Sequence, residues 1–280
     1  MTIRTPLFCG TDLAERIERV DAHFIAMAIE VASARGDQVA FAREIAGGAA
    51  TFHEPGSPLN KVAGLGFAGV PTTDELAQVE KAFHGLDAPV QVELSNLADP
   101  AVGEFLTERG YRLAGYEHVL GLALAELAVT APPTGIEIRR CREDESDTAL
   151  DILIDALLAP DTEGAAAAEE FPREALGNAI RDMEAAGAQR YLALIDGVAV
   201  GTSSMRIADG VAHFAGTATS APYRRRGVQS ALIAARLSEA KAAGCDLATV
   251  TTGPGTKSQQ NLQRRGFDLL YTRALLLKTP

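Results

Sequence analysis

Apolar residues along the chain follow a helical period in some segments and a strand period in others. Between Leu13 and Gly36 they recur every three or four residues, which predicts an amphipathic helix capped by Asp12 with Glu15 three residues later. Alternation with period two over residues 39–54 predicts a hairpin that turns at Gly47-Gly48. The same periods predict the other elements of the first half: strand 60–70, helix 72–85, strand 88–95, helix 99–111 and strand 117–127.

A second series of elements follows residues 128–135, whose Pro, Gly and Thr content is typical of a linker. Asp196-Gly197 and Asp209-Gly210 are expected to form the turns of a three-stranded meander. The predicted elements are strand 136–141, helix 143–158, helix 173–187, the meander over 190–219, helix 228–244, strand 247–252, helix 258–266 and strand 269–277.

The ends of the two series resemble each other. Both "FLTERGYRLAGYEHVLGLAL" and "NLQRRGFDLLYTRALLLK" contain a helix, an Arg-Gly-aromatic junction and a strand. We interpret this likeness as a tandem duplication, with one domain over 1–127, a linker over 128–135 and a second domain over 136–280. The alternative is a common junction that recurs by chance, because the likeness covers few residues.

Composition limits the function further. The chain has 280 residues, which favours two domains, and its net charge of -11 disfavours nucleic-acid and anionic-membrane partners. No apolar run is long enough to span a bilayer, and the N-terminus lacks a signal-peptide core. Cys9, Cys141 and Cys245 are far apart and match no metal-binding spacing, which is typical of a reducing compartment. We therefore expect a cytoplasmic protein without a metal.

Three consecutive arginines, Arg224 to Arg226, precede Gly227 and the predicted helix from Val228. The first N–H groups of a helix lack internal partners and lie at the positive end of its dipole, so an anion is stabilised there. Glycine allows close backbone approach, and arginine side chains bind phosphate oxygens. A solvated basic face and a nucleic-acid contact are the alternatives, but the following helix adds few basic residues. The loop favours a pyrophosphate ligand.

The segment Arg224–Gln229 resembles the (Gln/Arg)-x-x-Gly-x-(Gly/Ala) loop of the GNAT superfamily of acyl-CoA N-acyltransferases, and Ser258–Phe267 resembles its S-x-x-N-x-x-x-x-G-F variant. The resemblance covers about 136–280, whereas the first half shares only element order. Gln229 departs from the small residue of the pattern. The resemblance implies an α/β (α+β) fold with two GNAT-like domains, each a mixed, mostly antiparallel sheet flanked by helices.

The resemblance also implies a binding site for acetyl-CoA, with CoA as the product. The pantetheine arm is expected along the strand end and the pyrophosphate on main-chain amides of the loop, with two polar residues of the last helix near the thiol. The corresponding residues are Thr217, Ala218, Thr219, Arg224, Arg225, Arg226, Gly227, Val228, Gln229, Ser230, Ser258 and Asn261. For Ser258 and Asn261, helix N-capping is the alternative role.

Strand alternation predicts that His213, Ala215, Thr217 and Thr219 share one face of their strand. His213 falls where histone-acetylating members carry a general-base glutamate, and imidazole suits that role near neutral pH. A structural hydrogen bond is the alternative role.

The general acid is harder to place. Many members have a tyrosine four residues before the last Gly-Phe pair, where this chain has Leu262. Tyr271 in the final strand and Tyr223 beside the loop are the substitutes, with strand packing as the alternative role of Tyr271. Solvent and the product amine are the alternative proton donors. The acidic loop residues Glu163, Glu169 and Glu170 are candidates for recognising a cationic acceptor, with a solvated acidic loop as the alternative.

The sequence therefore predicts an N-acetyltransferase that transfers an acetyl group from acetyl-CoA to a primary amine of a small molecule or peptide. A non-catalytic acyl-CoA sensor on the same fold is the alternative. In the first half, Thr72 and Thr73 occupy the corresponding helix start without a glycine or arginine, so that copy is expected to have lost its acyl-CoA site.

Overall fold

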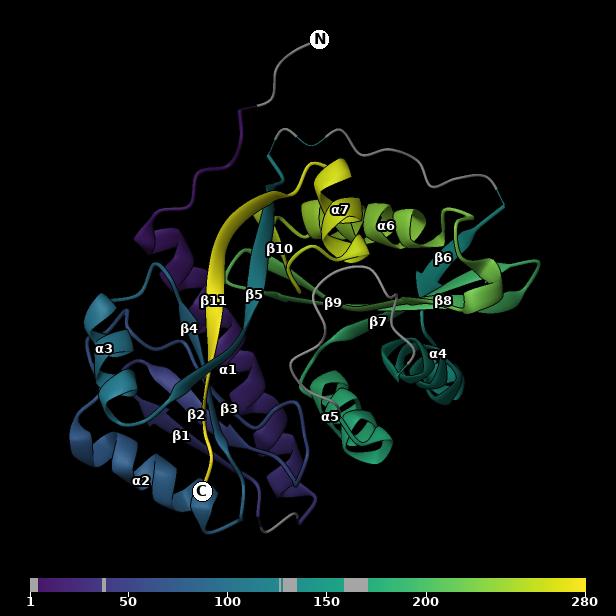
Figure 1. Cartoon of the computed structure of the whole chain (residues 1–280). Coiled ribbons are helices and arrows are strands. Elements are labelled where there is room, and N and C mark those ends of the chain that lie inside the picture. The colour runs from purple at the N-terminus through teal and green to yellow at the C-terminus, as the bar shows by residue number, and fades with distance from the viewer. Residues whose placement is uncertain (1–4, 37–38, 126, 128–134, 159–170) are drawn as a thin grey trace. The chain divides into compact units, whose positions relative to one another are not determined.

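The computed structural model describes residues 5–36, 39–125, 127, 135–158 and 171–280. They form two compact units, each built from segments that are distant in sequence (Figure 1). Unit 1 comprises Met1–Leu120, Glu163–Ala186 and Thr252–Pro280, and unit 2 comprises Gly121–Thr162 and Gly187–Thr251. The predicted linker 128–135 lies outside the described residues except for Gly135. The division of the chain into two copies at that linker stays a prediction.

Unit 1 has a mostly antiparallel sheet with strand order β1-β2-β3-β4-β11-β5, in which β3 and β4 are parallel. Its elements are α1 (Thr11–Ala34), β1 (Phe41–Ile45), β2 (Gly48–Phe52), β3 (Lys61–Ala63), α2 (Thr73–His84), β4 (Val90–Ser95), α3 (Pro100–Glu108), β5 (Arg112–Ala123), α5 (Arg173–Ala185), α7 (Lys257–Arg264) and β11 (Asp268–Lys278).

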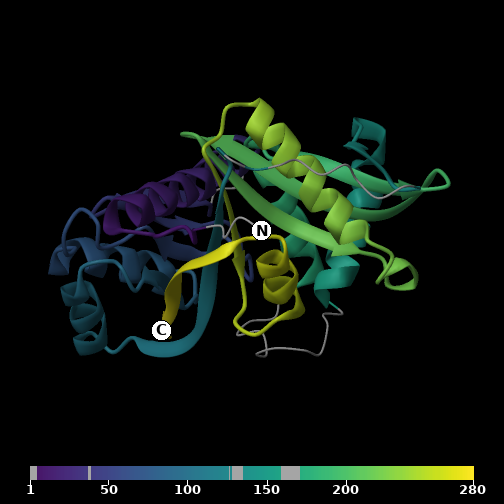
Figure 2. The same ribbon diagram turned by 90° about the horizontal axis from the view of Figure 1, so that it is seen from above.

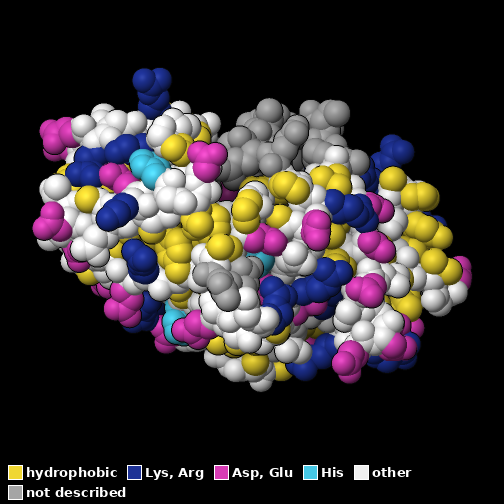
Figure 3. All heavy atoms as spheres, turned by 90° about the horizontal axis from the view of Figure 1, so that it is seen from below, with side chains coloured by type: hydrophobic (Ala, Val, Ile, Leu, Met, Phe, Trp, Pro, Cys, Tyr) yellow, Lys and Arg dark blue, Asp and Glu magenta, His cyan; other side chains and the backbone are white. Residues whose placement is uncertain are grey.

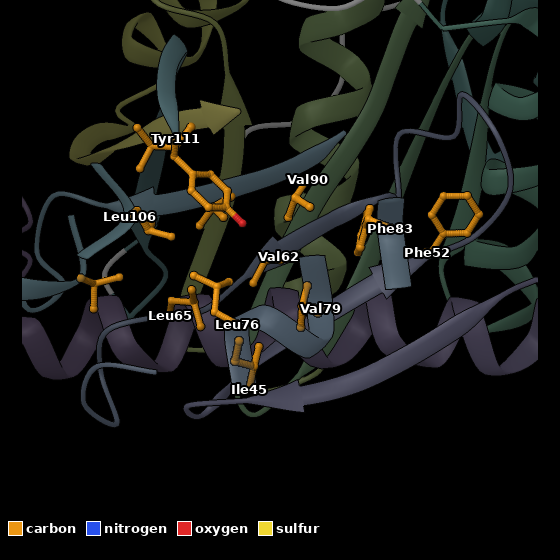
Figure 4. Packing of buried hydrophobic residues seen from close by; sticks show 14 of the residues in the cluster. Ile45, Phe52, Val62, Leu65, Leu76, Val79, Phe83, Val90, Leu106 and Tyr111 are labelled. Carbon is orange, nitrogen blue, oxygen red and sulfur yellow. The ribbon is translucent and has the colours of Figure 1, made fainter. Parts of the chain in front are cut away.

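One face of this sheet holds the apolar core of unit 1 (Figure 4). Val90 and Val92 of β4 are fully buried there with Leu76 and Phe83 of α2. The ring of Phe83 lies edge-on to that of Phe52, with centroids 5.6 Å apart. Because alternate residues of a strand face opposite sides, the apolar side of β4 leaves Glu93 on the other face.

The other face carries a buried group of charged residues that α1 covers. Arg273 of β11 lies 2.7 Å from Glu18 and 2.7 Å from Asp21, both on α1. Lys61 forms an ion pair with Glu93 on the neighbouring strand. Buried charges are tolerated only when they are paired and hydrogen-bonded, and these pairs satisfy that condition.

The strands of unit 2 have the order β10-β9-β8-β7-β6 and are mostly antiparallel, with β9 and β10 parallel. Its elements are β6 (Glu137–Arg140), the 3₁₀-helix η1 (Glu143–Glu145), α4 (Ser146–Leu158), β7 (Gln189–Ile195), β8 (Val198–Ala208), β9 (Val211–Thr219), the 3₁₀-helix η2 (Ala221–Tyr223), α6 (Val228–Ala242) and β10 (Leu247–Thr252). The predicted mixed fold with mostly antiparallel sheets flanked by helices is confirmed.

Helices cover both faces of the unit 2 sheet, with α6 on one face and α4 on the other (Figure 1). Figure 2 shows α6 lying along the strands. The close approach of α6 requires Gly201 of β8, because a Cβ there would lie 2.6 Å from the Val228 side chain and 2.9 Å from the Ala218 carbonyl oxygen. The start of α6 is thereby held against the ends of β8 and β9.

Three details differ from the sequence predictions. Helix α1 is capped by Gly10 without a side-chain bond, so Asp12 lies inside the first turn and the predicted cap is wrong. The first hairpin turns at Ala46-Gly47, where φ is 44° and 81°, instead of Gly47-Gly48. The predicted strand 60–70 is only Lys61–Ala63, because glycines with positive φ follow it. The turns at Asp196-Gly197 and Asp209-Gly210 are confirmed.

Candidate acyl-CoA site

Strand β9 contains a bulge that changes which way its side chains face. Ser204 of β8 pairs with Ala215, and Thr202 pairs with Ala218, so one residue of β8 is opposite two of β9. Gly216 lies at the bulge with φ 54°. A glycine is favoured there because its φ is in the left-handed region and a Cβ would lie 3.0 Å from Leu153 of α4.

The bulge overturns the prediction that four residues of β9 share one face. His213 pairs with Arg206, on the face of the sheet that α4 covers together with Gly216. Thr219 pairs with Gly201, on the face that α6 covers. The extra residue at the bulge shifts the alternation by one, so His213 and Thr219 lie on opposite faces.

The parallel ladder between β9 and β10 covers only the first part of both strands. Its last pair is Phe214 with Val250, although β9 continues to Thr219. Thr251, the next residue of β10, has a buried hydroxyl oxygen without a hydrogen-bond partner. Backbone groups of β9 beyond the ladder are therefore available to an extended ligand, in the manner of an added strand.

The arginine loop ends in a helix start that has no side-chain cap. Gly227 is the N-cap of α6 with φ 87° and ψ 4°, and Ala231 N–H is the first to bond back to its carbonyl oxygen at 2.9 Å. Arg225 also has a positive φ of 62°. No side chain therefore caps the start of α6, and a helix N-terminus is a place where anions bind.

The arginine side chains surround this helix start. Arg224 Nε donates to the Thr219 carbonyl oxygen at 3.5 Å, which ties the loop to the end of β9. Arg226 lies over the Tyr223 ring at 5.3 Å, and both Arg225 and Arg226 are exposed. On the face seen in Figure 3, basic and acidic side chains are interspersed, which does not resemble a duplex-binding surface.

His213 is half-buried on β9. Its Nδ1 lies 3.4 Å from Thr249 Oγ1 of β10, which is fully buried. A contact at one ring nitrogen orients the imidazole. The structural role and the predicted role as a base are both compatible with this contact.

The other predicted residues belong to unit 1. Thr256, not Ser258, caps α7, because its hydroxyl accepts from Gln259 N–H at 3.2 Å, so the alternative role of Ser258 as a cap is wrong. Ser258 and Asn261 are half-buried in that helix, and Leu262 is buried. Tyr271 is buried in β11 and donates to Glu18 Oε1 at 2.7 Å. Contact of these residues with acyl-CoA stays a prediction.

The helix start of unit 1 that corresponds to α6 is closed by its own side chains. Thr72 Oγ1 accepts from Glu75 N–H at 3.2 Å, and Glu75 Oε2 accepts from Thr72 N–H at 2.7 Å. This capping box uses the donors that an anion would need, and Asp74 adds a second negative charge to the first turn. That this copy does not bind acyl-CoA stays a prediction.

Two polar residues of unit 2 with buried side-chain atoms, Arg236 and Thr251, were not predicted from the sequence. Arg236 of α6 is fully buried, and Thr251 carries the unpartnered hydroxyl described above. The position of Arg236 four residues after the buried Leu232 was the available signal. Glu163, Glu169 and Glu170 lie outside the described residues. No helix in the described part of the chain is long and apolar enough to cross a membrane, and no group of potential metal ligands occurs there.

The fold resembles that of several solved GNAT structures. A GCN5-related N-acetyltransferase from Kribbella flavida has 23% identity and a TM-score of 0.63, covering 90% of this chain and 96% of its own. A tandem GNAT protein from the clavulanic acid biosynthesis pathway has 13% identity and a TM-score of 0.60, with 98% and 97% covered. An acetyltransferase of the GNAT family from Novosphingobium aromaticivorans has 17% identity and a TM-score of 0.53, with 92% and 99% covered. These likenesses define the fold as that of GNAT proteins.

Part of the sequence also matches a family model. Residues 152–267 match the family model of the acetyltransferase (GNAT) family, a segment that includes the bulged strand, the arginine loop and α6. A search of curated proteins gave no match. Residues 152–267 of the chain are therefore similar to the GNAT acetyltransferase family.

Proposed function

We propose that the protein is an N-acetyltransferase that transfers the acetyl group of acetyl-CoA to a primary amine of a small molecule or peptide. The observation that carries this proposal is the start of α6, where Gly227 with φ 87° is the N-cap and no side chain caps the helix. A pyrophosphate gains charge-assisted hydrogen bonds there without displacing any side-chain cap. The exposed Arg225 and Arg226 add positive charge at the same point.

The end of β9 is the proposed support for the pantetheine arm. Thr217, Ala218 and Thr219 lie beyond the last β9–β10 pair, so we propose that an extended amide-containing ligand pairs with β9 on the side away from β8. The pyrophosphate contacts assigned to main-chain N–H groups from Arg225 to Ser230 lie directly after this strand. Both proposed contact regions lie within unit 2.

Acyl transfer also needs a base for the amine. His213 is the proposed base, acting directly or through a water molecule, with Nδ1 fixed by Thr249. Ser258 and Asn261 remain proposed contacts to the thiol end of the ligand. The net charge of -11 favours a cationic acceptor through long-range attraction. We further propose a cytoplasmic location and a tandem arrangement in which only the copy over 136–280 binds acetyl-CoA.

One observation favours a second candidate function, a non-catalytic acyl-CoA sensor. Leu262 is buried where many GNAT enzymes have a tyrosine acid, and Tyr271 already donates to Glu18. Calorimetry with acetyl-CoA, followed by thiol release with a panel of primary amines, separates the two. We expect binding and turnover, with turnover abolished in His213→Ala. Binding without turnover of any amine would favour the sensor, and absence of binding would exclude both functions.

A further inference from the structure

Arg236 is a buried charge in unit 2 that has only neutral hydrogen-bond partners. Its side chain is 1% exposed, and its Nη1 donates to the Ser204 carbonyl oxygen at 2.9 Å. Nη2 donates to Thr217 Oγ1 at 2.9 Å, and Nε donates to the Leu232 carbonyl oxygen at 3.2 Å. Within the described part of the chain, no carboxylate forms an ion pair with it. The guanidinium lies 4.3 Å from the centre of the Phe214 ring.

Such a charge is costly to bury without an anion. Burial lowers the pKa of the Arg236 guanidinium to about 9, so the group stays charged at pH 7. Partial charges of carbonyl and hydroxyl oxygens and the face of Phe214 offset only part of the lost hydration. A buried charge of this kind stabilises a nearby anion more strongly than an exposed charge would.

Thr217 connects this charge to the proposed substrate strand. Its hydroxyl oxygen accepts from Arg236, so the hydroxyl hydrogen must point to another acceptor. No described residue provides that acceptor. Thr217 is half-buried and lies beyond the last pair of the β9–β10 ladder, at the bulge of β9. The hydroxyl is thus a polarised donor at the place where a ligand is proposed to pair with β9.

We propose that Thr217 donates a hydrogen bond to the sulfur of CoA and that Arg236, acting through Thr217, stabilises the departing thiolate. This inference rests on the proposed acetyltransferase function. In the step concerned, the amine nitrogen bonds to the acetyl carbonyl carbon and the carbon–sulfur bond breaks. The electron pair leaves on sulfur as the CoA thiolate, and the proton lost by the amine passes to His213 or to water. Thr217 is then a catalytic residue and Arg236 a positioning residue.

The positions of His213 and Thr217 on opposite faces of β9 fit their proposed roles as base and as donor to the thiolate. His213 lies on the face of β9 that α4 covers, whereas Thr217 reaches Arg236 on the α6 face. A thioester held at the end of the ladder would meet the base from one face and the thiolate donor from the other. A thiolate held in this way needs no general acid.

Ionisation of the bound CoA thiol tests the proposal without an acceptor amine. Thiolate absorbance is followed against pH for the protein with CoA, using desulfo-CoA as the reference ligand. We expect the bound thiol to ionise at a pH at least one unit below that of free CoA, which is a tenfold or larger change in its dissociation constant. Thr217→Val should abolish this shift and Thr217→Ser should retain it. Arg236→Met should reduce it, and calorimetry reports CoA affinity for each variant.

A control variant and two kinds of negative result separate the role of Thr217 from the proposed function. Thr202→Val removes a buried hydroxyl from β8 that donates to the Tyr191 carbonyl oxygen, so it serves as a matched control that should keep the shift. CoA binding with an unshifted thiol in the unmodified protein, or a shift retained in Thr217→Val, would overturn the role of Thr217. Failure of CoA to bind at all would overturn the proposed function itself and is distinguished by calorimetry.

Discussion

The hydroxyl of Tyr271, in the last strand, donates a 2.7 Å hydrogen bond to Glu18 Oε1, in the first helix. Arg273 Nε donates to the same carboxylate oxygen at 2.7 Å. Both contacts are buried, and they join residues more than 250 positions apart in the sequence. The C-terminal strand is therefore part of the structure that holds α1 on the sheet of unit 1.

We expect Tyr271→Phe to lower the free energy of unfolding by about 1–3 kcal/mol, because it removes one donor from a buried carboxylate. Urea denaturation followed by circular dichroism measures this change. Tyr116→Phe is the control, since that side chain is exposed and should be neutral. A hundredfold fall in kcat of the folded Tyr271→Phe protein, with stability unchanged, would instead support the predicted role of Tyr271 as the proton donor.

A second prediction concerns the pH dependence of unit 1. Burial, together with the nearby Glu93, raises the pKa of Glu117 to about 7, although Lys61 and Arg273 partly oppose this effect. The folded protein then binds a proton at Glu117 more tightly than the unfolded chain does. The contribution of Glu117 to stability is complete below about pH 4.5 and is lost as the pH rises to about 7.

Glu117→Gln mimics the protonated carboxyl and should remove this part of the pH dependence. We expect the variant and the unmodified protein to have similar urea midpoints at pH 5, and the variant to have the higher midpoint at pH 8. Glu104→Gln, at an exposed position of α3, is the control and should leave both midpoints unchanged. A higher midpoint for the unmodified protein at pH 8 would mean that Glu117 is stabilised as a carboxylate.

Local sequence signals predicted the elements well where one residue type determines the backbone. The Asp-Gly turns at 196–197 and 209–210 follow from the tolerance of Asp and Gly for positive φ. Long-range pairing was not predictable in the same way. Periodicity identifies β11 as a strand, but it carries no information that Leu275 pairs with Glu93 of β4. Because of that pairing, the C-terminal strand β11 is part of unit 1.

The candidate site was predictable in its loop and much less so in its side chains. Gly227 before a helix indicates an anion site by local geometry alone. The prediction that His213 and Thr219 lie on the same face of β9 was wrong, because the extra residue at the Gly216 bulge reverses the alternation. A glycine inside a strand is a known sign of a bulge. Arg236 was missed because arginine is seldom fully buried.

The third prediction concerns the closed helix start of unit 1. Thr72→Ala removes the oxygen that accepts from Glu75 N–H and should lower the free energy of unfolding by about 1 kcal/mol. Affinity for CoA should not change, because the capped helix does not bind it in our proposal. Calorimetry should give one CoA per chain for both proteins. A stoichiometry of two, or weaker CoA binding in Thr72→Ala, would contradict the assignment of a single site.

The fourth prediction ranks the contributions of backbone and side chain at the arginine loop. Gly227 has φ 87° at the start of α6, and Gly244 has φ 81° just beyond its end. A valine at either position is strained by about the same amount, typically 1–2 kcal/mol, because both need the left-handed region. Only the strain at Gly227 displaces the N–H groups proposed to hold the pyrophosphate.

We therefore expect Gly227→Val to weaken CoA binding by about a hundredfold or more, whereas Gly244→Val should lower stability with less than a threefold effect on affinity. Arg225→Ala should weaken binding by only about three- to tenfold, because an exposed arginine is screened by solvent. Calorimetry at two salt concentrations separates the contributions, since the arginine effect should shrink at high salt and the glycine effect should not. A larger loss for Arg225→Ala than for Gly227→Val would show that side chains, and not the helix start, hold the phosphates.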